Sequence, residues 1–152
     1  MKKYSSKETL DQLLSINPLF RKLITRPMEL CFSADLTVTQ LYTMTALSEA
    51  DSMNMTQLAS QLYISKQQLT KIVDALVEKG FVHRFGDPGN RRVVLVSLTE
   101  SGQKLMRQHQ ELFIDSLIPA FDQLTDAQKH KLVSATEDIL QILQNLEIRV
   151  AH

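Results

Sequence analysis

Residues 55–98 constrain the fold of this chain more than any other stretch, because two helical patterns and two β-rich runs follow one another without interruption. Within 58–62, leucine and alanine share one face of a short helix. After a tight turn, Ser65 and Gln68 have the spacing of a capping box, which starts a second helix. Gly80 is placed to end that helix, since glycine is common just after the last helical turn.

Two β-rich runs follow, at 81–85 and 93–98, and a polar loop with the sequence Gly-Asp-Pro-Gly-Asn-Arg-Arg separates them. Helix, turn, helix and hairpin in this order predict a mainly helical chain built around a winged helix-turn-helix with a small β-hairpin wing. Residues 53–55 are expected to add a short strand that pairs with the wing.

The second helix is the best candidate for a binding surface. Four apolar residues at i, i+3, i+4 and i+7, starting at Leu69, give it one buried stripe, and the remainder of its surface is polar. The first turns of a recognition helix contact base edges, where glutamine pairs with adenine and lysine with guanine. Ser65 and the free N–H groups beside it can also hold a phosphate. The alternative is a solvated helix face with no ligand.

Arg91 and Arg92 lie in the loop of the predicted hairpin, beside two glycines and a proline. A basic loop of this kind has the reach to enter a minor groove. The alternative is an ordinary charged turn, but its position directly after a helix-turn-helix favours contact with DNA.

The same stretch carries a resemblance to a known family. Residues 65–84, then Asp-Pro-Gly-Asn-Arg-Arg at 87–92 and Leu-Thr-Glu-Ser-Gly at 98–102, are similar to the MarR family of bacterial transcription regulators. Further matching segments are 36–40, 58–59 and 76–80. The similarity in sequence pattern covers residues 30–105.

The resemblance implies a cytoplasmic homodimer that represses transcription from palindromic operators and is released by a small phenolic or lipophilic effector. It implies that Asp87 braces a wing arginine, while Asn90 stands where the family commonly has a second acid. The expected contacts with double-stranded DNA are Ser65, Lys66, Gln67, Gln68, Thr70 and Lys71 on the helix, and Arg84, Asp87, Arg91 and Arg92 on the wing.

The composition of the chain is compatible with this interpretation. At 152 residues, of which 43% are hydrophobic, the chain is expected to form a single domain, 1–152. Residues 62–98 hold six basic and three acidic side chains although the whole chain has no net charge, so the predicted DNA-binding region is basic. The sequence contains no run of about 18 apolar residues, so no membrane span is expected. The lysines near the N-terminus precede no apolar segment, so no secretory signal is expected.

The two ends of the chain carry more apolar helical surface than a winged lobe of residues 36–98 can cover. We therefore expect the helices within 7–32 and 100–148 to form a dimerisation region. Prolines at 27 and 119 are expected to kink these helices. The alternative is that the helices pack against one another within one protomer.

Other chemistry finds little support in the sequence. The single cysteine, Cys31, suits a reducing cytoplasm and is expected to be a packed side chain, with a peroxide-sensing thiol as the alternative. The four histidines lack metal-ligand spacing, and no phosphate loop or nucleophile motif occurs, so neither a cofactor nor an enzyme is expected. A winged-helix module that binds protein remains a further alternative.

Overall fold

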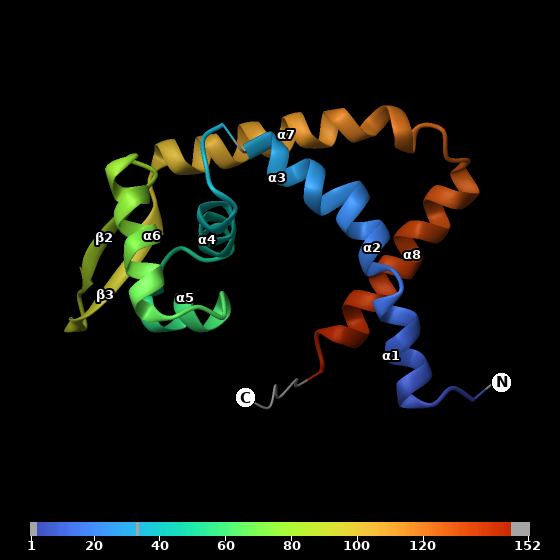
Figure 1. The fold of residues 1–152 in the computed structure, drawn as a ribbon, viewed down its shortest axis with the longest axis horizontal. Helices are drawn as coiled ribbons and strands as arrows, with labels where there is room; N and C mark the ends of the chain where they lie inside the picture. Colours follow the sequence, from blue (N-terminus) through green and yellow to red (C-terminus); the bar gives the residue numbers. More distant parts are fainter. Residues whose placement is uncertain (1–2, 33, 147–152) are drawn as a thin grey trace. The chain divides into compact units, whose positions relative to one another are not determined.

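A computed structural model of the chain describes residues 3–32 and 34–146, with the side chain of Arg91 left out. The chain divides into two compact units, residues 1–113 and 114–152. Helices dominate the described residues of both units (Figure 1). The first unit contains a three-stranded antiparallel sheet. The predicted fold class, a mainly helical chain with a winged helix-turn-helix and a small wing, is confirmed.

The first unit opens with α1 (Ser6–Leu14), followed by α2 (Asn17–Phe20), the π-helical segment η1 (Arg21–Thr25) and α3 (Arg26–Phe32). Pro27 was expected to kink this region. The helical chain continues from α2 to α3 through the π-helical segment η1, which ends two residues before Pro27, and such a segment is itself a common site of helix bending. In a regular α-helix the proline ring collides with the carbonyl four residues back. The wider π turn places that collision outside the regular helical ladder.

The winged lobe follows, with α4 (Val38–Ser48), β1 (Met53–Asn54), α5 (Met55–Gln61), α6 (Lys66–Glu78), β2 (Val82–Asp87) and β3 (Asn90–Leu98). The strands lie in the order β1-β3-β2, and β1 pairs with β3 at Met53 and Val96. The short strand expected near residues 53–55 is therefore present. The helix α6 lies beside the hairpin, with β2 and β3 on one side of it (Figure 1).

A single apolar core holds the winged lobe together and fixes the orientation of α6. The stripe predicted for the second helix is buried, with Leu69, Val73 and Leu76 fully removed from solvent. Other fully buried members are Leu41, Met44 and Leu47 of α4, Leu58 of α5 and Val96 of β3. Because full burial of such a side chain stabilises a fold by about 1.5–3 kcal/mol, rotation of α6 about its axis would be costly.

Local hydrogen bonds set where the helices of the lobe begin. Thr37, Asn54 and Ser65 are the N-caps of α4, α5 and α6, and each forms a capping box with a glutamine three residues later. Each box satisfies two backbone N–H groups that the helix itself leaves unpaired. The start of α6 is thus determined by the four consecutive residues 65–68.

The wing differs from the prediction. Its strands run to Asp87 and from Asn90, which are paired, so that only Pro88 and Gly89 lie between them. The predicted long polar loop is therefore wrong: its flanking residues belong to the strands. The reason is local, since Asp87 Oδ1 accepts from the N–H of Gly89 at 2.8 Å and Asn90 Oδ1 accepts from the N–H of Arg92 at 3.1 Å.

The helix α7 (Glu100–Phe121) begins in the first unit and ends in the second, and α8 (Asp126–Leu143) belongs to the second. Pro119, which was expected to kink its helix, lies inside α7 two residues before the end of that helix. Thr125 and Gln128 form the capping box that starts α8. Among the residues described, no helix combines the length and hydropathy that a membrane-spanning segment requires.

Candidate nucleic-acid interface

The outward face of α6 carries the polar residues predicted to contact bases. Gln67 and Lys71 are exposed and lie four residues apart, so their side chains are neighbours on the face opposite the buried stripe. Lys66 is also exposed at the start of the helix. An amide and an ammonium group side by side on a helix whose other face is fixed in a core are suited to reading base edges.

Ser65 and Gln68, two of the predicted contact residues, are hydrogen-bonded to each other at the start of α6. The side-chain oxygen of Gln68 accepts from both the backbone N–H and the hydroxyl of Ser65 at 3.0 Å, while Ser65 Oγ accepts from the N–H of Gln68 at 3.2 Å. This reciprocal arrangement holds both side chains at the helix N-terminus. Gln68 is thus a capping residue, and its carbonyl oxygen is already engaged.

Thr70 is also constrained, because its hydroxyl donates to the carbonyl of Lys66 at 2.8 Å. The side chain remains exposed beside Lys71, but its hydroxyl hydrogen is used within the helix. Thr70 can therefore offer an acceptor oxygen or its methyl group to a ligand.

Arg84, predicted as a DNA contact, reaches from β2 to α6. Its Nη1 lies 2.6 Å from Oδ1 of Asp74, and its Nη2 donates to the carbonyl of Thr70 at 3.2 Å. Asp74 was not among the predicted site residues. The sequence shows both as charged residues within 62–98, but no local pattern joins two residues that lie ten positions apart.

The wing places its basic residues on a strand. Arg92 is exposed on β3, and Arg91 belongs to the same strand, although its side chain lies outside the described part of the structure. The carboxylate of Asp87 accepts from Gly89, which shapes the turn. The expected bracing of an arginine by Asp87 remains a prediction.

Residues 36–94, which span α4 to β3, match the model of the MarR family. The chain therefore carries a MarR-family domain, which spans less than half of its length. It is 36% identical over 78 residues to YvnA of Bacillus subtilis (strain 168), an uncharacterised HTH-type transcriptional regulator. That match covers 51% of this chain and 50% of YvnA, so the chain spans about half the length of this relative.

Two solved structures share the fold. RV1404 from Mycobacterium tuberculosis superposes with a TM-score of 0.78 at 23% identity, and the match covers 97% of this chain and 100% of RV1404. Streptococcus pneumoniae FabT in complex with DNA gives a TM-score of 0.65 at 19% identity, covering 94% of this chain and 100% of FabT. At these identities the likeness shows the fold alone.

The turn between α5 and α6 contains a feature that the sequence did not reveal. Tyr63 has a φ of 54°, a left-handed conformation that favours glycine, and its side chain is 82% exposed. It lies two residues before the N-cap Ser65. No sequence signal marks this position, because a tyrosine argues against a left-handed turn.

The C-terminal end of α6 is hydrogen-bonded to α4 and to the segment that precedes α4. Lys79 Nζ donates to the carbonyl of Asp35 and lies 3.4 Å from the side-chain oxygen of Gln40 in α4. The carboxylate of Asp35 in turn lies 3.0 Å from Nε2 of His109 on α7. Asp35 therefore links the C-terminal end of α6 to α7.

Cys31 also contacts His109. Its backbone carbonyl is 2.8 Å from Nδ1 of His109, and the imidazole stacks on Phe32 with ring centroids 4.6 Å apart. The thiol side chain is half-buried and packs against the core. This environment suits the packed cysteine that was expected. Within the part of the chain that the structure describes, no group of three His, Cys, Asp or Glu could hold a metal ion.

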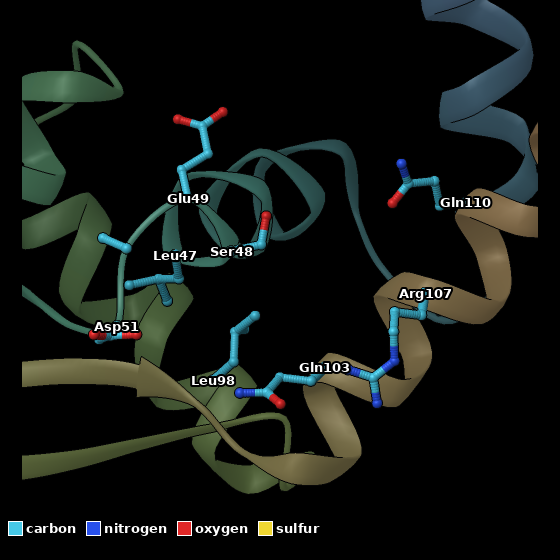
Figure 2. A pocket seen from close by; sticks show the side chains of 9 residues that line it. Leu47, Ser48, Glu49, Asp51, Leu98, Gln103, Arg107 and Gln110 are labelled. Atoms are coloured by element: carbon cyan, nitrogen blue, oxygen red, sulfur yellow. The ribbon is translucent and has the colours of Figure 1, made fainter.

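An open pocket of about 650 Å³ separates the end of α4 from the start of α7. Figure 2 shows Gln103 and Arg107 of α7 on one side and Leu47, Glu49 and Asp51 on the other. Ser48, Ala50, Leu98 and Gln110 complete the lining. With two carboxylates and one guanidinium among its residues, the pocket offers more hydrogen-bonding groups than a site for a purely lipophilic ligand needs.

Proposed function

We propose that this chain is a sequence-specific DNA-binding transcription regulator. The observation that carries the proposal is the exposed pair Gln67 and Lys71 on α6, opposite a stripe fixed in the core, with Arg92 on the neighbouring wing. The description of YvnA as an HTH-type transcriptional regulator and the complex of FabT with DNA support it. A protein-binding face would be richer in aromatic and aliphatic side chains than this one.

In this mechanism α6 enters the major groove with its N-terminal half. Lys66, Gln67 and Lys71 face base edges, while Ser65 and the first N–H groups of the helix approach a phosphate. The β2–β3 hairpin lies along the flanking minor groove, where Arg92 and Arg91 contact it. Thr70 contributes packing against a base edge or sugar.

We further propose that the chain acts as a homodimer on a palindromic operator. Large apolar side chains are exposed on the N-terminal helices of the first unit, including Leu10, Leu14, Leu19, Phe20 and Leu23. In the second unit, exposed apolar side chains include Ile118, Leu132, Val133, Leu140, Ile142 and Leu146. Surfaces of this kind mark association sites. A twofold dimer would place two recognition helices about 34 Å apart, which is one turn of DNA.

A dimer bound across a promoter blocks access to it, so repression is the proposed mode of regulation. The pocket between α4 and α7 is the proposed effector site (Figure 2). A small phenolic compound or another ligand with polar groups would release DNA only if it binds one arrangement of α4 and α7 more tightly than the other.

The proposal is tested by selecting binding sites from random duplex DNA with purified protein at low salt. We expect an enriched palindrome whose half-sites lie about one helical turn apart. Sedimentation of the protein with that duplex should then give two chains for each site. A folded protein that enriches no duplex would contradict the proposed function, and a single half-site bound by one chain would contradict the dimer.

A further inference from the structure

The ion pair between Arg84 and Asp74 has a bearing on how α6 can approach DNA. Asp74 lies seven residues after Gln67 and three after Lys71, so the three side chains share one face of the helix. The Asp74 side chain is 56% exposed. A carboxylate on the face proposed to enter the major groove would be repelled by the phosphates on either side of that groove.

Arg84 neutralises this carboxylate in a defined geometry. One guanidinium nitrogen lies 2.6 Å from Asp74 Oδ1, and another donates to the carbonyl of Thr70, which is one helical turn earlier. The guanidinium thus spans two consecutive turns of α6. Its own side chain is only 31% exposed, which is less than that of its partner.

The position of Arg84 in the sheet makes this a link between the two DNA-reading elements. Arg84 lies on β2 and is paired in register with Val96 of β3, a fully buried residue. The strand that leads to the wing tip is therefore fastened to the recognition helix at Thr70 and Asp74. Any change in the angle between the hairpin and α6 must stretch this contact.

We propose that Arg84 is a positioning residue for DNA recognition, one that neutralises Asp74 and holds the wing against α6, and that it does not itself bind the DNA. This inference rests on the proposed function. It replaces the role of direct DNA contact that the sequence predicted for Arg84. It also explains why a carboxylate, which cannot attract a phosphate, lies on this face of α6: Asp74 binds Arg84 of the wing strand.

The two roles of Arg84 predict opposite results when Asp74 is also changed. If Arg84 acts on Asp74, Arg84→Ala exposes an uncompensated carboxylate to the DNA, and Asp74→Asn in the same chain removes it again. If Arg84 instead binds a phosphate, that interaction is missing from the single and the double variant alike. The test therefore measures the dissociation constants of wild type, Arg84→Ala, Asp74→Asn and the double variant on the selected duplex by fluorescence anisotropy.

We expect Arg84→Ala to weaken binding at least tenfold and the double variant to recover most of that affinity. Because Asp74→Asn makes any variant more positive, Arg92→Ala with and without Asp74→Asn is the matched control. The recovery should be several times larger in the Arg84→Ala background than in the Arg92→Ala background. Equal recovery in both backgrounds, or none in the first, would overturn the proposal.

The salt dependence of DNA binding provides a second readout. It changes when a contact with a phosphate is lost and stays the same when only a structural contact is lost. Removal of one protein–phosphate interaction lowers the slope of log affinity against log salt by about 0.9. We expect the Arg84→Ala with Asp74→Asn variant to retain the wild-type slope, and a slope reduced by about 0.9 per protomer would overturn the proposal. Arg84→Gln, which keeps a hydrogen-bond donor for Thr70, replaces the alanine variant if that variant does not fold.

These outcomes are distinguishable from failure of the proposed function. Wild-type protein that binds no duplex contradicts DNA binding itself. Wild-type binding with equal recovery in the two backgrounds contradicts only the positioning role of Arg84.

Discussion

Tyr63 and Gly80 occupy equivalent positions at the ends of two successive helices. Both have a positive φ, 54° and 74°, and both donate a backbone hydrogen bond to the carbonyl three residues back. In each case the next residue, Ile64 or Phe81, donates to the carbonyl five residues before it. These are two copies of the Schellman motif, one with the favoured glycine and the other with a tyrosine.

The difference between the two motifs predicts that Tyr63→Gly stabilises the protein. A left-handed backbone costs an L-residue about 1–2 kcal/mol, and the greater freedom of glycine in the unfolded chain offsets part of the relief. We expect the free energy of unfolding to rise by about 0.5–1 kcal/mol, measured by urea denaturation at fixed protein concentration. Gly80→Ala is the control and should lower it by about 1 kcal/mol. A decrease in stability in Tyr63→Gly would show that the exposed ring makes a favourable contact.

Gly102 is predicted to tolerate no side chain at all. A Cβ built at this position lies 2.1 Å from the carbonyl oxygen and 3.0 Å from the carbonyl carbon of Phe81, which are backbone atoms that cannot rotate away. We expect Gly102→Ala to lower the free energy of unfolding by about 3 kcal/mol. Gly86→Ala, where no atom lies within 4 Å of a Cβ, should change it by less than about 0.5 kcal/mol. Equal thermal melting of the two variants would contradict this prediction.

Gln67 and Gln68 are adjacent in sequence but should respond differently to alanine. Gln68→Ala removes half of the capping box and should cost about 1 kcal/mol of stability, while the selected DNA sequence stays the same. Gln67→Ala should leave stability within about 0.5 kcal/mol of wild type but relax the preference at one base pair. Chemical denaturation and repeated site selection measure the two effects. A changed base preference in Gln68→Ala would mean that the cap opens on DNA.

The wing arginines are predicted to bind without reading sequence. Arg91→Ala combined with Arg92→Ala should weaken binding to all duplexes and flatten the salt dependence, by about 0.9 in slope for each phosphate that is no longer bound. Lys7→Ala with Lys22→Ala removes the same charge from the N-terminal helices and should leave the slope unchanged. If the selected sequence changes while the slope holds, the wing reads bases.

His109 should contribute to stability through its three contacts. His109→Ala removes the stack on Phe32, the partner of the Cys31 carbonyl and the contact with the Asp35 carboxylate. We expect the free energy of unfolding to fall by about 2 kcal/mol, because a half-buried acceptor is left without its donor. His130→Ala on the exposed surface of α8 should change it by less than about 0.5 kcal/mol. Calorimetry of both variants at one concentration compares them, and similar melting temperatures would contradict the assignment.

The features that the sequence predicted correctly are those set by short-range rules. The stripe of Leu69, Val73 and Leu76 follows from helical periodicity, and the cap at Ser65 follows from residues three positions apart. The wing was predicted as a hairpin but with too long a loop. Its strands reach Asp87 and Asn90 because these side chains bond the turn backbone, which polarity alone does not indicate.

The features that sequence reasoning missed depend on the tertiary fold. The pairing of Arg84 with Asp74 exists only because β2 folds back along α6, and it is the basis for the proposal that Arg84 positions the wing. The link from Lys79 through Asp35 to His109 joins segments that are distant in the sequence. The strain at Tyr63 is hidden because the surrounding turn, and not the residue, sets the backbone conformation.

The π-helical segment η1 has a consequence for symmetry. A π turn is equivalent to one residue inserted into an α-helix, and one residue corresponds to a rotation of about 100°. The apolar side chains before η1, such as Leu19 and Phe20, are thus out of phase with those after it. A helix that packs along this segment must follow two faces in succession. In a twofold dimer each copy would have the same rotation between its two apolar faces. Deletion of a single residue within 21–25 would therefore realign the apolar faces in both copies at once.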